Sequence, residues 1–454
     1  MLTYAEALQA LAERGRFGIR LGLGRTRALL RELGHPEREF RGALIGGTNG
    51  KGSVVALVGS ALGAAGLRAG ETPKPHLVSY RERLQIGGRP IDAATFARLV
   101  EIVLPIADRV ARRLGEPTEF ELLTAMFFRW FADESVELAV VEVGLGGRLD
   151  ATHAWDGGVA TITNVDLDHM DRLGPTVTAI AREKAAIIVR GDRAVTGATG
   201  EALGVIRRRA RGVGVELVEV APAPLLGWDR DGISVELPGL GATRVGLRGR
   251  HQAANVAVAD ATLDALAAAG IATIPAAARR RGYADVTWPG RLEIVTADGR
   301  DIVLDGAHNP AGAAALATAL DDLRPYLAGE RGDRDPETPL TLVVATMADK
   351  DVDGVIAALA MAASAHGGTV ICTSLDVPRA LPADALAGRW SAVAAVGAGL
   401  RIVAEADPDR ALDRALDEAR GPIVVGGSLY LVGRARARLV DDPLLRDPEE
   451  PPNR

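Results

Sequence analysis

The sequence predicts an α/β protein in two successive parts, the first of them built around a parallel sheet. Apolar, β-branched runs alternate with helical patterns along the chain, as they do in βαβ units. A glycine-rich turn, "GGTNGKGS" at 46–53, joins one such run to an amphipathic helix pattern. Farther on, "VTWPGRLEIV" at 286–295 interrupts both periodicities. We therefore expect a hinge there, followed by a second α/β series.

Length, charge and cysteine content exclude several classes of protein. A chain of 454 residues indicates two or three domains, and a net charge of −6 provides no global positive field for nucleic acid. Cys372 is the only cysteine, so an intramolecular disulfide is impossible and a reducing cytoplasm fits. The N-terminus does not resemble a secretory signal, and the longest uncharged run, 354–375, predicts a helix, a turn and a buried strand. We expect a cytoplasmic protein that neither binds nucleic acid nor spans a membrane.

The elements of the first part are predicted from the periodicity of apolar residues and from the glycines and prolines that interrupt it. Residues 215–249 carry short strands and glycines, which suggests a small antiparallel meander. A helix is expected over 251–270, ended by Gly270. Strands are expected at 43–47, 138–144, 159–165 and 193–197, and helices at 53–65, 93–114 and 119–133.

The second part repeats the alternation after the hinge. A polar stretch at 328–339 is expected to be a mobile loop, and the tail at 442–454 is expected to fray. Strands are expected near 301–305, 340–345, 369–373, 401–404 and 422–426.

The turn at 46–53 departs from the common phosphate loop G-x-x-x-x-G-K-[ST]. Gly52 stands where Ser or Thr is usual, and Ile45 fills the position of the first glycine. The context is nevertheless that of a phosphate cradle, because a strand leads into the turn and a helix leaves it. Lys51 would add a positive charge. A tight turn without a ligand is the less favoured alternative.

Further polar side chains follow the ends of predicted strands. Glu142 leaves an apolar strand and is well placed to hold the Mg²⁺ of a nucleotide. In the second part, Asp305 ends a strand and His308 follows it, while Arg291 in the hinge is a candidate phosphate clamp. Their shared position predicts one interdomain cleft. For His169 and Lys184, spacing alone favours a structural role over a functional one.

These motifs, in their order, resemble folylpolyglutamate synthases and dihydrofolate synthases of the Mur ligase superfamily, over about residues 20–435. The resemblance implies a P-loop ATPase domain of the Mur type at 1–288 and a smaller Rossmann-like domain at 289–454, with ATP between them. The motifs that carry the resemblance are "GTNGKGS", "TEFELLTAMFFRWF", "VEVGLGGRLDATH", "DLDHMDRLG", "AREKAAII", "HQAANVAVA", "PGRLE", "DGAHNPAG" and "DKD".

The same resemblance implies the roles of individual residues. Glu142 and His169 match magnesium ligands in a site for two ions. Lys184 matches a lysine that CO₂ carbamylates in this family, and its carbamate is expected at the metal site with Glu142 and His169. Lys51, Lys184 and His169 form the expected catalytic set. The residues expected at ATP are Thr48, Asn49, Gly50, Lys51, Gly52, Ser53, Asn255, Arg291, Asp305 and His308. The residues expected at the pteroate substrate are Thr118, Glu119, Phe120, Glu121, Leu149, Asp150 and Ala151.

One position departs from the family pattern. Where the family reads Thr-Ser-Pro-His-Leu, this chain has Lys74 in place of the serine, a magnesium ligand in the family, between Pro73 and Pro75. We expect the Lys74 ammonium to approach the nucleotide phosphates and to replace part of the charge of one magnesium. The equally favoured alternative is that Lys74 points to solvent.

The function implied by the resemblance is ATP-dependent amide formation between a folate-type carboxylate and L-glutamate, through an acyl phosphate. Dihydropteroate glutamylation and polyglutamate extension both remain open, and we expect a monomer. A cell-wall Mur ligase is the nearer rival, but only about 40 residues precede the loop, too few for its UDP-binding domain. An ATPase switch without synthetic chemistry leaves "DGAHNP" unexplained.

Overall fold

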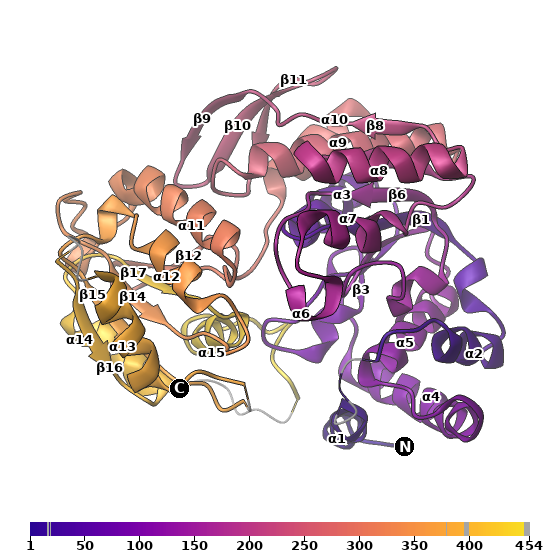
Figure 1. The fold of residues 1–454 in the computed structure, drawn as a ribbon, viewed down its shortest axis with the longest axis horizontal. Coiled ribbons are helices and arrows are strands. Elements are labelled where there is room, and N and C mark those ends of the chain that lie inside the picture. The colour runs from indigo at the N-terminus through magenta and orange to yellow at the C-terminus, as the bar shows by residue number, and fades with distance from the viewer. Residues whose placement is uncertain (16–17, 19, 378, 395–398, 449–454) are drawn as a thin grey trace.

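The protein contains three β-sheets, and helices pack on both faces of the two larger ones (Figure 1). The computed structural model describes residues 1–15, 18, 20–377, 379–394 and 399–448. Within those ranges the sheets have eight, three and six strands, which follow one another along the chain. The α/β class predicted from the sequence is confirmed.

The first sheet is parallel except at one edge. Its strand order is β4-β3-β2-β5-β1-β6-β7-β8, so the strand before the glycine-rich turn lies centrally, between β5 and β6. The edge strands β3 and β4 run antiparallel to their neighbours. The bounds are β1 Arg41–Gly46, β2 Ala69–Thr72, β3 Gln85–Ile86, β4 Arg89–Pro90, β5 Leu138–Glu142, β6 Gly158–Ile162, β7 Arg193–Thr196 and β8 Leu217–Glu219.

Alternate residues of β1 face two different hydrophobic cores, as the period of a strand requires. Leu44 packs into one core, while Ala43 and Ile45 pack into the other. The helices of the first core are α1 (Tyr4–Gly15), α2 (Gly24–Glu32), α4 (Ala93–Leu114), α5 (Glu119–Asp133), α7 (Val177–Ala185) and α8 (Gly200–Val213). Those of the second are α3 (Lys51–Ala64), α9 (Gln252–Ala268) and α10 (Ala276–Asp285).

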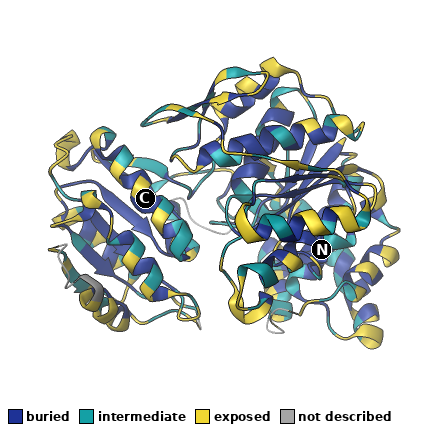
Figure 2. Cartoon of the chain, turned by 45° about the horizontal axis from the view of Figure 1, so that its top comes forward, coloured by how far each residue is buried: buried dark blue, intermediate teal, exposed yellow. Residues whose placement is uncertain are grey.

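The segment 215–249 divides between two sheets, so the predicted meander is only partly right. β8 pairs in parallel with β7 and extends the large sheet. The antiparallel meander consists of β9 (Leu225–Asp229), β10 (Gly232–Leu237) and β11 (Gly241–Val245), and it shares the core of α3, α9 and α10. The central strands β1, β5 and β6 of the large sheet are almost entirely buried (Figure 2).

The third sheet forms the second part of the chain. Its order is β12-β13-β17-β14-β15-β16, and β12 is the one antiparallel strand among those described. One face is covered by α11 (Pro310–Leu323), α12 (Val352–Leu359) and α13 (Ala383–Ala394), and the other by α14 (Pro408–Glu418) and α15 (Leu429–Leu439). The strands are β12 Glu293–Ala297, β13 Arg300–Leu304, β14 Thr341–Val344, β15 Thr369–Cys372, β16 Arg401–Ala404 and β17 Ile423–Gly426.

Two predicted irregular segments are more ordered than expected. The hinge is shorter than 286–295, because residues 293–297 pair with β13 as β12. The tail is held as far as it is described: Leu445 is buried, and Asp447 accepts a hydrogen bond from Ser79 at 2.6 Å. Residues 449–454 lie outside the described residues. Both segments are held by tertiary contacts, which local sequence patterns do not reveal.

None of the helices in the described residues combines the length and the apolar character needed to cross a membrane.

The contact between α3 and α10 generates a testable prediction. A Cβ on Gly282 would lie 2.5 Å from the Cα and 2.6 Å from the N of Ala61. Because that backbone cannot move aside without shifting α3, Gly282→Ala should lower the free energy of unfolding by about 1–3 kcal/mol. Urea denaturation measures the change.

Gly212→Ala on α8 is the matched control. No atom lies within 4 Å of a Cβ placed there, so the better helix propensity of alanine should stabilise the protein by up to about 1 kcal/mol. Equal unfolding midpoints for Gly282→Ala and the parent would contradict the close approach of the two helices.

Candidate active site

A cavity of about 600 Å³ lies where the carboxyl ends of β1, β5 and β6 meet the carboxyl end of β13. Residues of both parts of the chain line it, in agreement with the interdomain cleft that was predicted from the residues at strand ends. Parallel sheets place ligands at this edge. The structure brings the following predicted residues to its wall: Thr48, Asn49, Gly50, Lys51, Gly52, Ser53, Lys74, Phe120, Glu142, His169, Lys184, Asn255, Arg291, Asp305 and His308.

The turn between β1 and α3 has the geometry of an anion cradle. Gly50 precedes α3 with φ 80°, and a Cβ there would lie 2.2 Å from Oδ1 of Asn255. Glycine therefore suits this position both for the backbone angle and for the close approach of the Asn255 side chain. Lys51 donates from Nζ to the carbonyl oxygens of Gly47 and Thr48, at 3.1 and 3.0 Å. The positive end of α3 and this ammonium consequently face the same space.

Glu142 ends β5 and is 3% exposed. Burial raises the pKa of its carboxyl, and the charges of Lys51 and Lys74 oppose that rise. Its Oε2 accepts a hydrogen bond from the backbone N–H of Lys74 at 3.0 Å. A buried carboxyl with cations around it can bind a further cation only if an anionic ligand arrives with that cation.

Lys74 points into the protein rather than to solvent, which corrects one of its two predicted placements. Its Nζ donates to the carbonyl oxygen of Glu142 and lies 4.9 Å from the ring centre of Phe120 and 5.4 Å from that of Phe127. Burial lowers the pKa of this ammonium to about 8. The predicted approach to nucleotide phosphates stays a prediction.

Lys184 lies in α7 and is buried, at 5% exposure, rather than exposed to solvent. Its Nζ donates to the carbonyl oxygen of Gly47 at 2.6 Å, beneath the glycine-rich turn. Burial and the nearby charge of Lys51 lower the pKa of the amine to about 7. An amine in this state is neutral in part at physiological pH, which is the form that reacts with electrophiles.

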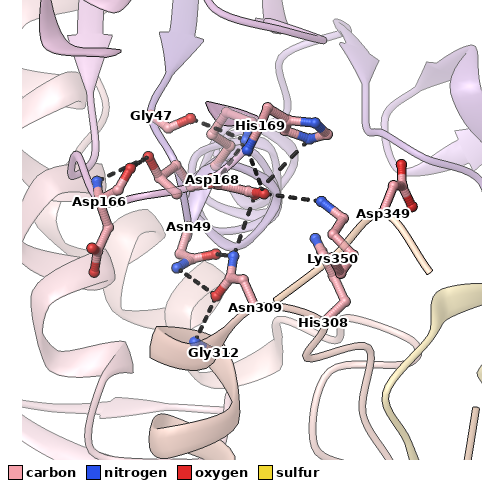
Figure 3. A network of polar contacts seen from close by, with 12 residues as sticks. Gly47, Asn49, Asp166, Asp168, His169, His308, Asn309, Gly312, Asp349 and Lys350 are labelled. Carbon is pink, nitrogen blue, oxygen red and sulfur yellow. Dashed lines mark hydrogen bonds and ion pairs between the residues drawn. The ribbon is translucent and has the colours of Figure 1, made fainter. Parts of the chain in front are cut away.

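A polar network crosses the cavity between the two parts of the chain (Figure 3). Asp168, after β6, pairs with Lys350 at 2.9 Å, although 182 positions separate them. Although burial opposes it, the charges of His169 and Lys350 hold the pKa of Asp168 well below its usual range. Asn49 of the cradle and Asn309 before α11 exchange hydrogen bonds of 3.1 and 3.4 Å. The contact between the two parts thus includes the cradle itself.

The hinge residues are held by the second part. Each oxygen of Asp305 accepts a backbone N–H at 2.9 Å, one from Leu292 and one from Ala307. His308 bonds through Nδ1 to the Gly306 carbonyl at 2.8 Å, and burial lowers its pKa to about 4. A neutral imidazole is therefore present beside Arg291 on the cavity wall.

The donor set fits a magnesium ion that arrives with phosphates better than a preformed metal cage. Among the described residues, no three His, Cys, Asp or Glu side chains are grouped closely enough to hold a metal. Mg²⁺ commonly takes one or two protein oxygens and completes its shell with phosphate and water. Glu142 and the Ser53 hydroxyl, both on the wall, match that pattern.

Most residues expected at the pteroate do not line this cavity. Phe120 alone of the seven lines the cavity as the structure describes it. Thr118 and Glu121 form a capping box at the start of α5, and Asp150 accepts hydrogen bonds from Leu145 and Thr152. Asp150 thereby holds the loop whose residues 144–146 do line the cavity.

Sequence reasoning missed several residues of the wall and its surroundings. Arg83 and Gln252 line the cavity, and Phe127 packs against Lys74. Phe127 lies in an apolar helix pattern typical of a core, so nothing local distinguished it. Arg83 was visible only as part of the charged run "RERL", and Gln252 only by its position beside His251 before a helix.

Comparisons with known proteins place both parts of the chain in one family. Residues 45–263 match the Mur ligase middle domain, and residues 290–428 match the glutamate ligase domain of Mur ligases. A dihydrofolate synthase/folylpolyglutamate synthase of Bacillus subtilis is 32% identical, over 96% of this chain and 99% of its own length. One of Mycobacterium tuberculosis is 36% identical, over 93% of this chain and 90% of its own length.

Solved structures give the same result. The folylpolyglutamate synthase of M. tuberculosis, complexed with ADP and AMPPCP, superposes with a TM-score of 0.84 at 32% identity, over 96% of this chain and 100% of that one. Escherichia coli FolC in complex with DHPP and ADP gives a TM-score of 0.79 at 27% identity, over 96% and 98% of the two chains. The chain belongs to the dihydrofolate synthase/folylpolyglutamate synthase family of Mur ligases.

Proposed function

We propose that this protein is an ATP-dependent ligase that joins L-glutamate to a folate-type carboxylate. The single observation that carries the proposal is the shared cavity, where a phosphate cradle and the aromatic side chain of Phe120 line one space of about 600 Å³. A ligase of this type must bring a carboxylate to the end of a triphosphate. The family membership supports the same reaction.

The reaction takes place in two steps. A carboxylate oxygen of the substrate attacks the γ-phosphorus of ATP, and ADP leaves, which produces an acyl phosphate. The amine of glutamate then attacks the acyl carbon, the tetrahedral intermediate expels phosphate, and the amine loses a proton. Lys51 and Arg291 would bind the phosphate oxygens throughout, because charge spreads over them in the transition state. Asn255 and His308 would hold the nucleotide from opposite sides of the cavity.

Magnesium and a modified lysine belong to the proposal. Glu142, with His169 and the Ser53 hydroxyl, would hold Mg²⁺, which neutralises phosphate charge when bound. We infer that Lys184 is carbamylated: its neutral amine adds to CO₂ and releases one proton, which leaves a carbamate anion. The burial of Lys184 and its low pKa support this inference, since an ammonium beside Mg²⁺ would be repelled.

The choice of substrate is tested directly. ADP release should require glutamate together with dihydropteroate, with tetrahydrofolate, or with either, and mass analysis of the products distinguishes the three cases. A cell-wall substrate linked to UDP should release no ADP.

We also propose that the domain boundary lies between residues 288 and 289, supported by the end of α10 at Asp285 and the start of β12 at Glu293. We expect the enzyme to act as a cytoplasmic monomer.

Removal of the cradle charge should impair the reaction. Lys51→Ala should lower the rate of amide synthesis by at least about 10²-fold, because a positioned cation on the transferring phosphoryl group contributes several kcal/mol. Initial rates at saturating ATP measure the change. Arg208→Ala, at an exposed cation of α8, is the control and should retain the parent rate. Equal rates for Lys51→Ala and the parent would refute the role of the loop.

Removal of the Lys184 amine should also lower the rate, in a way that a small carboxylic acid restores. Lys184→Ala should be poorly active, and formate or acetate should recover part of the rate by supplying the missing anion. The carbamate itself is detected by ¹³C NMR after equilibration with labelled CO₂. Active parent enzyme that shows no carbamate resonance would contradict the modification.

A further inference from the structure

The Lys74 ammonium faces the cavity without a carboxylate partner. Among the described residues, no Asp or Glu oxygen lies within the 4 Å of an ion pair with its Nζ, and its one hydrogen-bond acceptor is the backbone carbonyl of Glu142. An ammonium carries three N–H donors, so this ammonium has unused donors. Buried charges in proteins are normally paired. The missing partner is therefore expected among the ligands of the cavity.

The nearby acids, Asp150 and Glu142, are engaged in other hydrogen bonds. Both carboxyl oxygens of Asp150 are engaged, Oδ2 by the N–H of Leu145 at 2.8 Å and Oδ1 by Thr152, whose hydroxyl donates at 2.6 Å. Glu142 accepts the backbone N–H of Lys74 itself. These bonds fix both carboxylates at a distance from the ammonium, so its charge remains available.

The position of Lys74 distinguishes between two classes of anion. The polyphosphate has its own cations, Lys51 and Arg291, and the N-terminus of α3. Lys74 lies instead at the rings of Phe120 and Phe127, and Phe120 is on the cavity wall with Leu145. A ligand that meets this corner must offer an anion and apolar surface together. An aromatic carboxylic acid does so, whereas a phosphate offers only the anion.

We propose that Lys74 binds the substrate carboxylate that accepts the phosphoryl group, with the aromatic ring of the substrate against Phe120. The inference rests on the proposed function and refines it, because it favours dihydropteroate, whose reacting carboxylate is attached to an aromatic ring. The Lys74 loop is held to Glu142 through its backbone N–H, so the ammonium is positioned before the substrate arrives. Lys74 neutralises the carboxylate that would otherwise be repelled by the phosphates.

Equilibrium binding tests this role without turnover. Dihydropteroate and its carboxamide, which lacks the charge, are titrated by calorimetry into parent and Lys74→Met, each saturated with AMPPCP. The parent should prefer the carboxylate, and Lys74→Met should lose about 10- to 100-fold of that preference, as expected for a hydrogen bond to a charged group. The carboxamide should bind both proteins within about twofold. Lys74→Arg should keep part of the preference.

Each other outcome has a definite meaning. If the parent binds neither compound and releases no ADP with glutamate, the proposed function itself fails. If the parent binds dihydropteroate and Lys74→Met keeps the full preference for the carboxylate, only the role of Lys74 fails. Weaker AMPPCP binding by Lys74→Met with an unchanged preference would assign Lys74 to the nucleotide and overturn the inference. Thermal melting of both variants shows whether they are folded, and an unfolded methionine variant leaves Lys74→Gln to decide.

Discussion

The parallel pairing of β1 with β5 and β6 is the constraint on which the site depends. Because these strands run in the same direction, the glycine-rich turn, Glu142 and the residues after β6 all emerge at one edge. The register sets Ile45 beside Glu142 and beside Thr161, so the start of the turn and the carboxyl are neighbours from the outset. No single helix or loop could bring together such distant segments of the chain.

A second consequence of this arrangement is an accumulation of positive charge. Lys51, Lys74 and Lys184 approach from α3, the loop after β2 and α7, and Arg291 approaches from the hinge. Their burial costs solvation, which is visible in the low pKa values of Lys74 and Lys184. Anionic ligands remove that cost when they bind. The charges of the site therefore favour a triphosphate and a carboxylate over a neutral ligand.

The sequence predicted the parts of the fold that have strong local signals. Hydrophobic periodicity and glycine or proline breaks predicted four of these parts: the turn at 46–53, the helices at 93–114 and 119–133, and the strand that Glu142 ends. β8 was misassigned because Leu217–Glu219 is too short to show a period, and only its pairing with β7 defines it. The site followed mainly from ordered motifs. The pairing of Asp168 with Lys350 and the contact of Lys74 with Phe127 join segments far apart, and no local pattern reports them.

The described end of the chain ties the loop that carries Lys74 to the second part of the molecule. Asp447 bonds to Ser79 and Arg81, and Arg81 also donates to the carbonyl of Arg446 at 2.7 Å. The last helix, α15, ends at Leu439. The eight residues from there to Asp447 extend to at most about 28 Å. This short connection limits how far the third sheet can move from the first while the loop that carries Lys74 stays in place. A wider opening would first have to break the bonds of Asp447 to Ser79 and Arg81. This connection therefore couples the width of the cleft to the order of that loop.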